Sequence, residues 1–189
     1  MTTLRAFVAV ALPDDVRCAL AALQHQLRPG LPAAWSRPTG MHLTLHFLGD
    51  VESNQLDDIT GALETTCARH EPFSSTARGL GVFPGPRRPR VLWAGLTDAG
   101  PLVELQQALC GPLETCGVPI ADRTYRPHLT LARFSGQPGR QGLSSLRSIL
   151  QNEQRDFGTV PVEEVRLYRS ELLPGRAHHT LLSTARLGR

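Results

Sequence analysis

The hydrophobic and polar positions of this 189-residue chain alternate between the short period of strands and the longer period of helices. An apolar run over residues 4–12 predicts a buried strand, and Pro13-Asp14-Asp15 then opens a helix that continues to about Leu27. Apolar residues at helical spacing over 54–70 and 102–116 predict two further helices. Residues 73–82 and 91–95 form a predicted hairpin, and alternating stretches at 160–162, 165–169 and 179–187 predict antiparallel strands. The pattern therefore predicts a chain that contains both helices and antiparallel strands.

One short sequence motif occurs twice in the chain. The first copy is His42-Leu-Thr-Leu-His-Phe-Leu-Gly-Asp50, and a near copy returns as His128-Leu-Thr-Leu-Ala-Arg-Phe-Ser-Gly136. Strand alternation places the histidine and the threonine of each copy on one face, with the leucines on the other, and in the first copy it adds His46 to the polar face. A single H-x-T is common in half-exposed strands. Its repetition predicts one site built from two roughly equivalent halves that face each other across a cleft.

Three proline-bearing loops lie close to these motifs. The loop over 85–90 carries Arg87, Arg88 and Arg90, and the loop over 121–127 carries Arg123 and Arg126. Such arginines fit contacts with nucleic acid phosphates, and they fit solvated turns equally well. The loop over 29–40 leads into the first motif, and its Trp35 either lines the site or simply packs.

Composition sets broad limits. The length and the 41% hydrophobic content suit one domain, residues 1–189, and a net charge of +3 allows an anionic partner without demanding one. The four cysteines form no C-x-x-C pair, so we expect reduced, buried thiols and a cytoplasmic location. No apolar run is long enough to cross a bilayer, and no membrane partner is expected.

The motifs H-L-T-L-H-F-L-G and P-H-L-T-L-A-R, with G-V-F-P and R-V-L-W-A-G between them, resemble those of the 2H phosphoesterase superfamily. The closest resemblance is to its RNA 2′,3′-cyclic phosphodiesterases, also called the 2′-5′ RNA ligase family, and it covers almost the whole chain. It implies a bilobal α+β fold in which two antiparallel sheets line a central cleft, with helices outside and one H-x-T motif from each half. The family also implies RNA ends or nucleotides with a 2′,3′-cyclic phosphate as substrates.

The resemblance assigns roles to five positions. His42 and His128 fall on the catalytic histidines, with His128 as general base and His42 as general acid, and Thr44, Thr130 and Arg133 fall on phosphate-binding positions. Strict alternation would turn Arg133 away from His128, so a bend at the end of that strand is expected.

The residue types fit this chemistry independently. Opening a cyclic phosphate with water needs a base for the water proton and an acid for the departing ribose oxygen, and histidine titrates near neutrality. The threonine hydroxyls would donate hydrogen bonds to phosphate oxygens, so no metal or cofactor is required. We expect a 2′-phosphomonoester as product, formed by a monomer, and a 2′-5′ linkage from the reverse reaction.

Two alternatives stand beside this interpretation. One is an RNA-binding module without turnover, which would use as phosphate contacts Arg87, Arg88, Arg90, Arg123 and Arg126. The other is a catalytic zinc held by His42, His46 and His128. Two matched H-x-T pairs favour the phosphoesterase, because neither alternative explains the threonines.

Overall fold

The computed structural model describes residues 2–120, 124–173 and 176–188. The described helices are α1 (Asp14–Leu27), α2 (Leu56–Cys67), α3 (Gly100–Thr115) and α4 (Arg140–Asn152). The described strands are β1 (Thr3–Ala11), β2 (Ala34–Trp35), β3 (His42–Glu52), β4 (Phe73–Phe83), β5 (Val91–Thr97), β6 (His128–Arg133), β7 (Asp156–Val162), β8 (Glu164–Leu173) and β9 (Arg176–Arg186). These bounds agree closely with the sequence pattern, although β2 falls in a segment expected to be a loop. The turn expected at Pro174-Gly175 lies outside the described residues.

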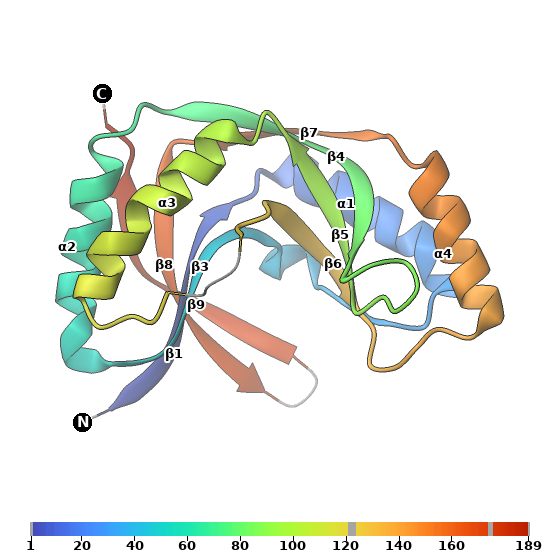
Figure 1. Cartoon of the computed structure of the whole chain (residues 1–189), viewed down its shortest axis with the longest axis horizontal. Coiled ribbons are helices and arrows are strands. Elements are labelled where there is room, and N and C mark those ends of the chain that lie inside the picture. Colours follow the sequence, from blue (N-terminus) through green and yellow to red (C-terminus); the bar gives the residue numbers. More distant parts are fainter. Residues whose placement is uncertain (1, 121–123, 174–175, 189) are drawn as a thin grey trace.

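The strands form one antiparallel sheet that combines two half-sheets (Figure 1). The order is β7-β4-β5-β6 for the second half-sheet and β3-β1-β8-β9 for the first, and β2 pairs with β6 away from this path. The two half-sheets join where β3 meets β6, through the pair Leu43 and Leu129. The two sheets expected from the sequence are therefore continuous. Each half-sheet also draws strands from distant parts of the chain, since β8 and β9 pair beside β1.

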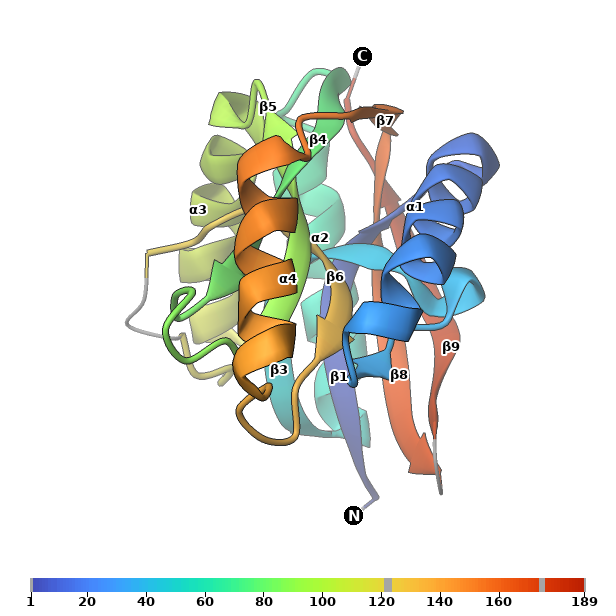
Figure 2. The same ribbon diagram turned by 90° about the vertical axis from the view of Figure 1, so that its right-hand side faces the viewer.

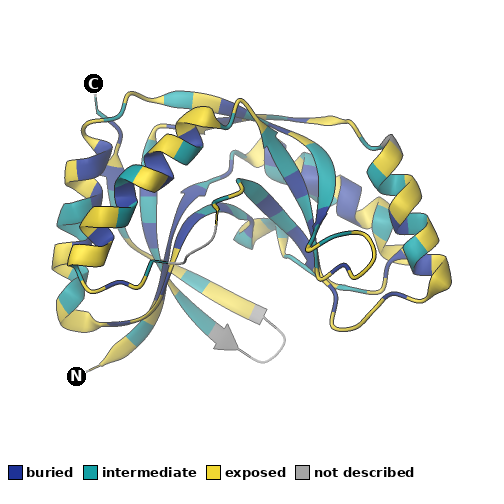
Figure 3. Cartoon of the chain, in the orientation of Figure 1, coloured by how far each residue is buried: buried dark blue, intermediate teal, exposed yellow. Residues whose placement is uncertain are grey.

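The helices cover the outside of this curved sheet, as expected. Helices α2 and α3 lie together at one end of the molecule, and α1 and α4 lie at the other (Figures 1 and 2). Each presents an apolar stripe to the strands, because leucines at helical spacing share one face. In α3 that stripe is fully buried and consists of Leu102, Leu105, Leu109 and Leu113. The buried positions in Figure 3 accordingly concentrate on the strands and on the inner faces of the helices.

Two smaller expectations have mixed outcomes. All four cysteines are free thiols, and Cys67 is buried as expected, but Cys18 is exposed on α1. Position 18 lies beside the apolar stripe of α1, whose buried residues include Val16 and Leu20, so its thiol faces solvent.

Among the described residues, no helix combines the length and the apolar character that a membrane crossing requires.

Candidate active site

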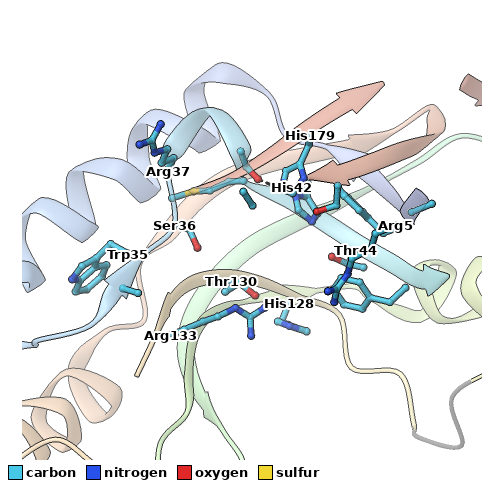
Figure 4. Close-up of a pocket in the computed structure, with 18 residues that line it drawn as sticks. Arg5, Trp35, Ser36, Arg37, His42, Thr44, His128, Thr130, Arg133 and His179 are labelled. Atoms are coloured by element: carbon cyan, nitrogen blue, oxygen red, sulfur yellow. Dashed lines mark hydrogen bonds between the residues drawn. The ribbon is translucent and has the colours of Figure 1, made fainter. Parts of the chain in front are cut away.

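Both H-x-T motifs line a single cleft of about 670 Å³ between the half-sheets. His42 and Thr44 approach it from β3, and His128 and Thr130 approach it from β6 (Figure 4). The two strands are antiparallel neighbours at Leu43 and Leu129, so the residues on either side of these leucines meet across the seam. The predicted juxtaposition of the two motifs is confirmed. Arg133 lines the same cleft.

The two imidazoles are held in matching ways. Nδ1 of His42 lies 2.8 Å from the carbonyl oxygen of Gly40, and Nδ1 of His128 lies 2.7 Å from that of Arg126. A carbonyl oxygen only accepts, so each Nδ1 carries a proton and donates it. Each neutral ring therefore keeps Nε2 as its free nitrogen, with an available lone pair. In both motifs the acceptor is the carbonyl two residues before the histidine.

A β-bulge explains why Arg133 faces the cleft. Along β5 and β6, Trp93 pairs with Thr130 while the next residue, Leu92, pairs with Ala132, so Leu131 is an extra residue in β6. An extra residue reverses the alternation beyond it. Ala132 is consequently buried and Arg133 returns to the face of Thr130. A bend at the end of this strand was expected from the sequence, and the bulge at Leu131 provides it.

The same bulge occurs in β3 and overturns the expectation for His46. Val8 pairs with His46 and Ala9 with Thr44, which leaves Leu45 as the extra residue. His46 is therefore turned into the core, at 6% exposure, instead of sharing the face of His42. The proposed metal set of His42, His46 and His128 is not formed, because His46 lies on the opposite side of the sheet.

His46 contacts helix α3 in that position. Its Nε2 lies 2.9 Å from Nε2 of Gln106 and 3.4 Å from Sγ of Cys110. The Gln106 amide is a donor, so Nε2 of His46 acts as its acceptor. This histidine is thus a structural link between the sheet and α3.

Aromatic side chains pack against the imidazoles of both motifs, but in different arrangements. His42 stacks on Phe7 at 4.6 Å between ring centroids, and the edge of His179 meets it at 5.3 Å. His128 instead lies edge-on to Phe83 at 5.0 Å and to Trp93 at 6.4 Å. The two sides of the cleft therefore surround equivalent histidines with different rings.

This packing makes both histidines poor proton carriers in the free protein. Burial lowers the pKa of His42 from 6.5 to about 4; the Gly40 carbonyl opposes this shift, while His179, Arg133 and His128 add to it. Burial also lowers the pKa of His128, against the Arg126 carbonyl, and Arg133 lowers it further. Near neutral pH both rings are therefore neutral in the free protein.

Comparison with known proteins identifies the family. The model of the 2′-5′ RNA ligase superfamily matches residues 12–172. The chain belongs to this superfamily. It is 36% identical over 184 residues to the RNA 2′,3′-cyclic phosphodiesterase of Methanothermobacter thermautotrophicus, covering 97% of this chain and 98% of that protein. It is also 36% identical over 187 residues to the protein of the same name from Thermus thermophilus, covering 95% and 88%.

Solved structures agree with this membership. The crystal structure of TT0787 of Thermus thermophilus has a TM-score of 0.81 at 32% identity, covering 97% of this chain and 98% of the other. E. coli LigT complexed with 3′-AMP has a TM-score of 0.77 at 24% identity, with full coverage of both chains. The second likeness concerns the fold alone.

None of the described arginines predicted from the loops lines the cleft. Arg87 and Arg88 are exposed in the β4–β5 loop, and neither lines the cleft. Arg126 also lies outside the lining, with its guanidinium 5.4 Å from the centroid of the Phe83 ring. Their role in RNA binding stays a prediction, and Arg123 lies outside the described residues.

Sequence reasoning missed several residues that do line the cleft. Arg5 and Phe47 extend it on the side of β1 and β3, and His179 contributes from β9. Phe47 is 61% exposed, and it occupies in β3 the position that Arg133 occupies in β6, directly after the bulge. Alignment of the two copies of the motif would have matched these two positions. Nothing in the local sequence marks Arg5.

We predict that His46→Ala lowers the free energy of unfolding by about 1–3 kcal/mol, because the buried Gln106 amide loses its acceptor. Urea denaturation followed by circular dichroism measures this change. His25→Ala is the matched control, since His25 is exposed on α1 and its loss should be nearly neutral. Equal stability of the two variants would contradict the structural role of His46.

Proposed function

We propose that this chain hydrolyses 2′,3′-cyclic phosphates at RNA ends or on nucleotides and releases 2′-phosphomonoesters. The observation that carries the proposal is the pair of matched imidazoles, each with a threonine beside it, on the two sides of one cleft. The names of the relatives at 36% identity support the same activity. One chain supplies both histidines, so a monomer suffices, and the bilobal unit of residues 1–189 acts as one domain.

The proposed reaction is an in-line displacement at phosphorus. Nε2 of His128 takes a proton from water, and the water oxygen attacks phosphorus as the P–O3′ bond breaks. His42, protonated on Nε2, gives its proton to O3′, so the phosphate stays on the 2′ oxygen. Each proton transfer of this kind contributes roughly 10²–10⁴-fold to the rate. With the 5′ hydroxyl of a second strand in place of water, the same steps would form a P–O5′ bond as the P–O3′ bond breaks. The two ends would then be joined through a 2′-5′ linkage, with O3′ leaving as a hydroxyl.

The remaining polar groups stabilise the developing charge. Thr44, Thr130 and Arg133 all line the cleft. In the proposed mechanism the two threonine hydroxyls donate to the non-bridging oxygens, and Arg133 supplies a positive charge beside them. Loss of one such donor costs about 2.7–4 kcal/mol of barrier in comparable sites. Protons and charge are therefore provided by side chains, and we propose that no metal or cofactor takes part.

The exposed Phe47 ring favours a nucleotide over a simple cyclic phosphate ester. Aromatic side chains stack on bases with about 1–3 kcal/mol per base, whatever the base. Phe47 lines the cleft on the side of β1 and β3, so we propose that it contacts the base of the reacting nucleotide.

The direct test uses adenosine 2′,3′-cyclic monophosphate and a short RNA with the same end. We expect turnover of both in the presence of a chelator, with a 2′-phosphomonoester as the product by phosphorus NMR. A 3′-phosphomonoester would contradict the proposed orientation of the ribose, and the absence of turnover on both substrates would contradict the proposed function.

Substitution of either histidine should abolish most of the activity. His42→Ala and His128→Ala should each lower kcat by about 10²-fold or more, because each removes one proton-transfer group. His178→Ala is the control, since His178 is exposed and lies outside the cleft lining, and we expect its kcat to be unchanged. A histidine variant with near wild-type kcat and a normal circular dichroism spectrum would eliminate the paired mechanism.

The lowered pKa values predict the pH dependence. The profile of kcat/KM reports the free enzyme, where the pKa of His42 is about 4 and that of His128 is also below 6.5, so its maximum should lie below pH 6.5 whichever ring is the base. The bound anion raises both pKa values, so the maximum of kcat should lie at higher pH. Steady-state rates over about pH 4 to 9 test this, and coinciding maxima at or above neutrality would contradict it.

A further inference from the structure

The cleft extends beyond the two histidines to a second group of side chains. Trp35, Ser36 and Arg37 line it from strand β2 and the loop that follows. In Figure 4, Trp35 and Arg37 lie at one end of the labelled residues, and Arg5 lies at the other, with His42 and His128 between them. The mechanism uses neither Trp35 nor Arg37.

Buried hydrogen bonds fix this segment in place. The carbonyl of Leu131, the extra residue of the β6 bulge, accepts from the backbone N–H of Ser36 at 2.9 Å and from Nε2 of Gln24 at 2.8 Å. The same Nε2 also donates to the carbonyl of Ser36 at 2.9 Å, and Gln24 is only 1% exposed. Trp35 pairs with Ala132 on β6. The segment is thus a preformed wall of the cleft.

Its two side chains have the chemistry of a nucleotide site. Trp35 is half-buried, and the guanidinium of Arg28 lies over its ring at 5.9 Å from the centroid, which holds the ring in a defined orientation. Arg37 is exposed at the rim, and none of the ion pairs formed by the described residues includes it. An aromatic ring beside an unneutralised arginine is the usual combination for single-stranded nucleic acid.

The charge of the cleft also exceeds what one phosphate requires. Arg5, Arg37 and Arg133 line it, and its described lining contains no aspartate or glutamate. Arg133 and the two histidines already surround the reacting phosphate. The ribose of that nucleotide carries its base and its 5′ phosphate on different carbon atoms, so these two groups leave the centre in different directions. If the base points toward Phe47, the 5′ phosphate would point toward the other end of the cleft, where Trp35 and Arg37 lie.

We propose that Trp35 and Arg37 form a second nucleotide subsite, which binds the residue on the 5′ side of the cyclic-phosphate end. Trp35 stacks on its base, and Arg37 pairs with the phosphodiester that joins it to the reacting nucleotide. This proposal rests on the proposed function, and it names the substrate class as an RNA strand of two or more nucleotides in preference to a mononucleotide.

The test compares kcat/KM on adenosine 2′,3′-cyclic monophosphate with that on a dinucleotide bearing the same end. Arg37→Gln should lower kcat/KM about tenfold on the dinucleotide, reduce its salt dependence by about one phosphate contact, and leave the mononucleotide unchanged. Arg69→Gln is the matched control, because Arg69 is an exposed arginine outside the cleft lining, and it should leave kcat/KM on both substrates unchanged.

A second comparison isolates the base. Trp35→Leu should lower kcat/KM on the dinucleotide about tenfold, whereas Trp35→Phe, which keeps an aromatic face, should retain most of it. With an abasic residue at the 5′ position, Trp35→Leu should have no further effect. Because Arg37 is exposed, Arg37→Gln gives a folded test even if Trp35→Leu fails to fold.

The outcomes separate the two proposals. Wild-type turnover of both substrates, with equal losses or no losses in the Arg37 and Trp35 variants, overturns the subsite and leaves the proposed function standing. Absence of turnover on both substrates by the wild-type enzyme overturns the function itself, and the subsite with it. A loss confined to the dinucleotide establishes the subsite.

Discussion

The pairing of Leu43 with Leu129 is the contact on which the arrangement of the site depends. It is where strands β3 and β6 join, and it makes one antiparallel sheet from two half-sheets. Antiparallel neighbours place His42 and His128 on opposite sides of a local two-fold axis, so two copies of one sequence meet at a single point. Because the pairing is limited to this position, the strands diverge beyond it and leave a cleft. A longer ladder between β3 and β6 would close that space.

The bulges then decide which side chains reach the cleft. In both motif strands the leucine after the threonine is extra, so the next two side chains lie on the faces opposite to those that simple alternation gives. One backbone geometry thus delivers Phe47 on one side and Arg133 on the other. An unpaired carbonyl at a buried bulge is costly, and at Leu131 it is satisfied by Gln24 and by the N–H of Ser36. The hydrogen bonds that stabilise the bulge therefore also position the wall that carries Trp35.

The sequence predicted the elements well because their patterns are local. The leucines of α3 and the alternation of the H-x-T strands needed no knowledge of distant neighbours. The errors arose where pairing with a neighbouring strand determines the face on which a side chain lies. The bulge at Leu45 is a property of the pairing with β1, so simple alternation misplaced His46. The second copy of the motif held the relevant signal, since the position of His46 is filled there by Ala132, a residue suited to the core. Likewise, the loop arginines were conspicuous in sequence, but the cleft arginines are Arg5, Arg37 and Arg133.

The electrostatics of the cleft follow from the same construction. Rings packed on Phe7 and Phe83 are partly desolvated, and desolvation disfavours the imidazolium form of both histidines. Arg133 adds repulsion, since the charge that would hold a phosphate also discourages protons on the neighbouring rings. Under the proposed mechanism, an anion between the histidines would reverse this balance, so the general acid would acquire its proton together with its substrate. In the free protein near neutral pH, both rings stay neutral beside the positive charge of Arg133.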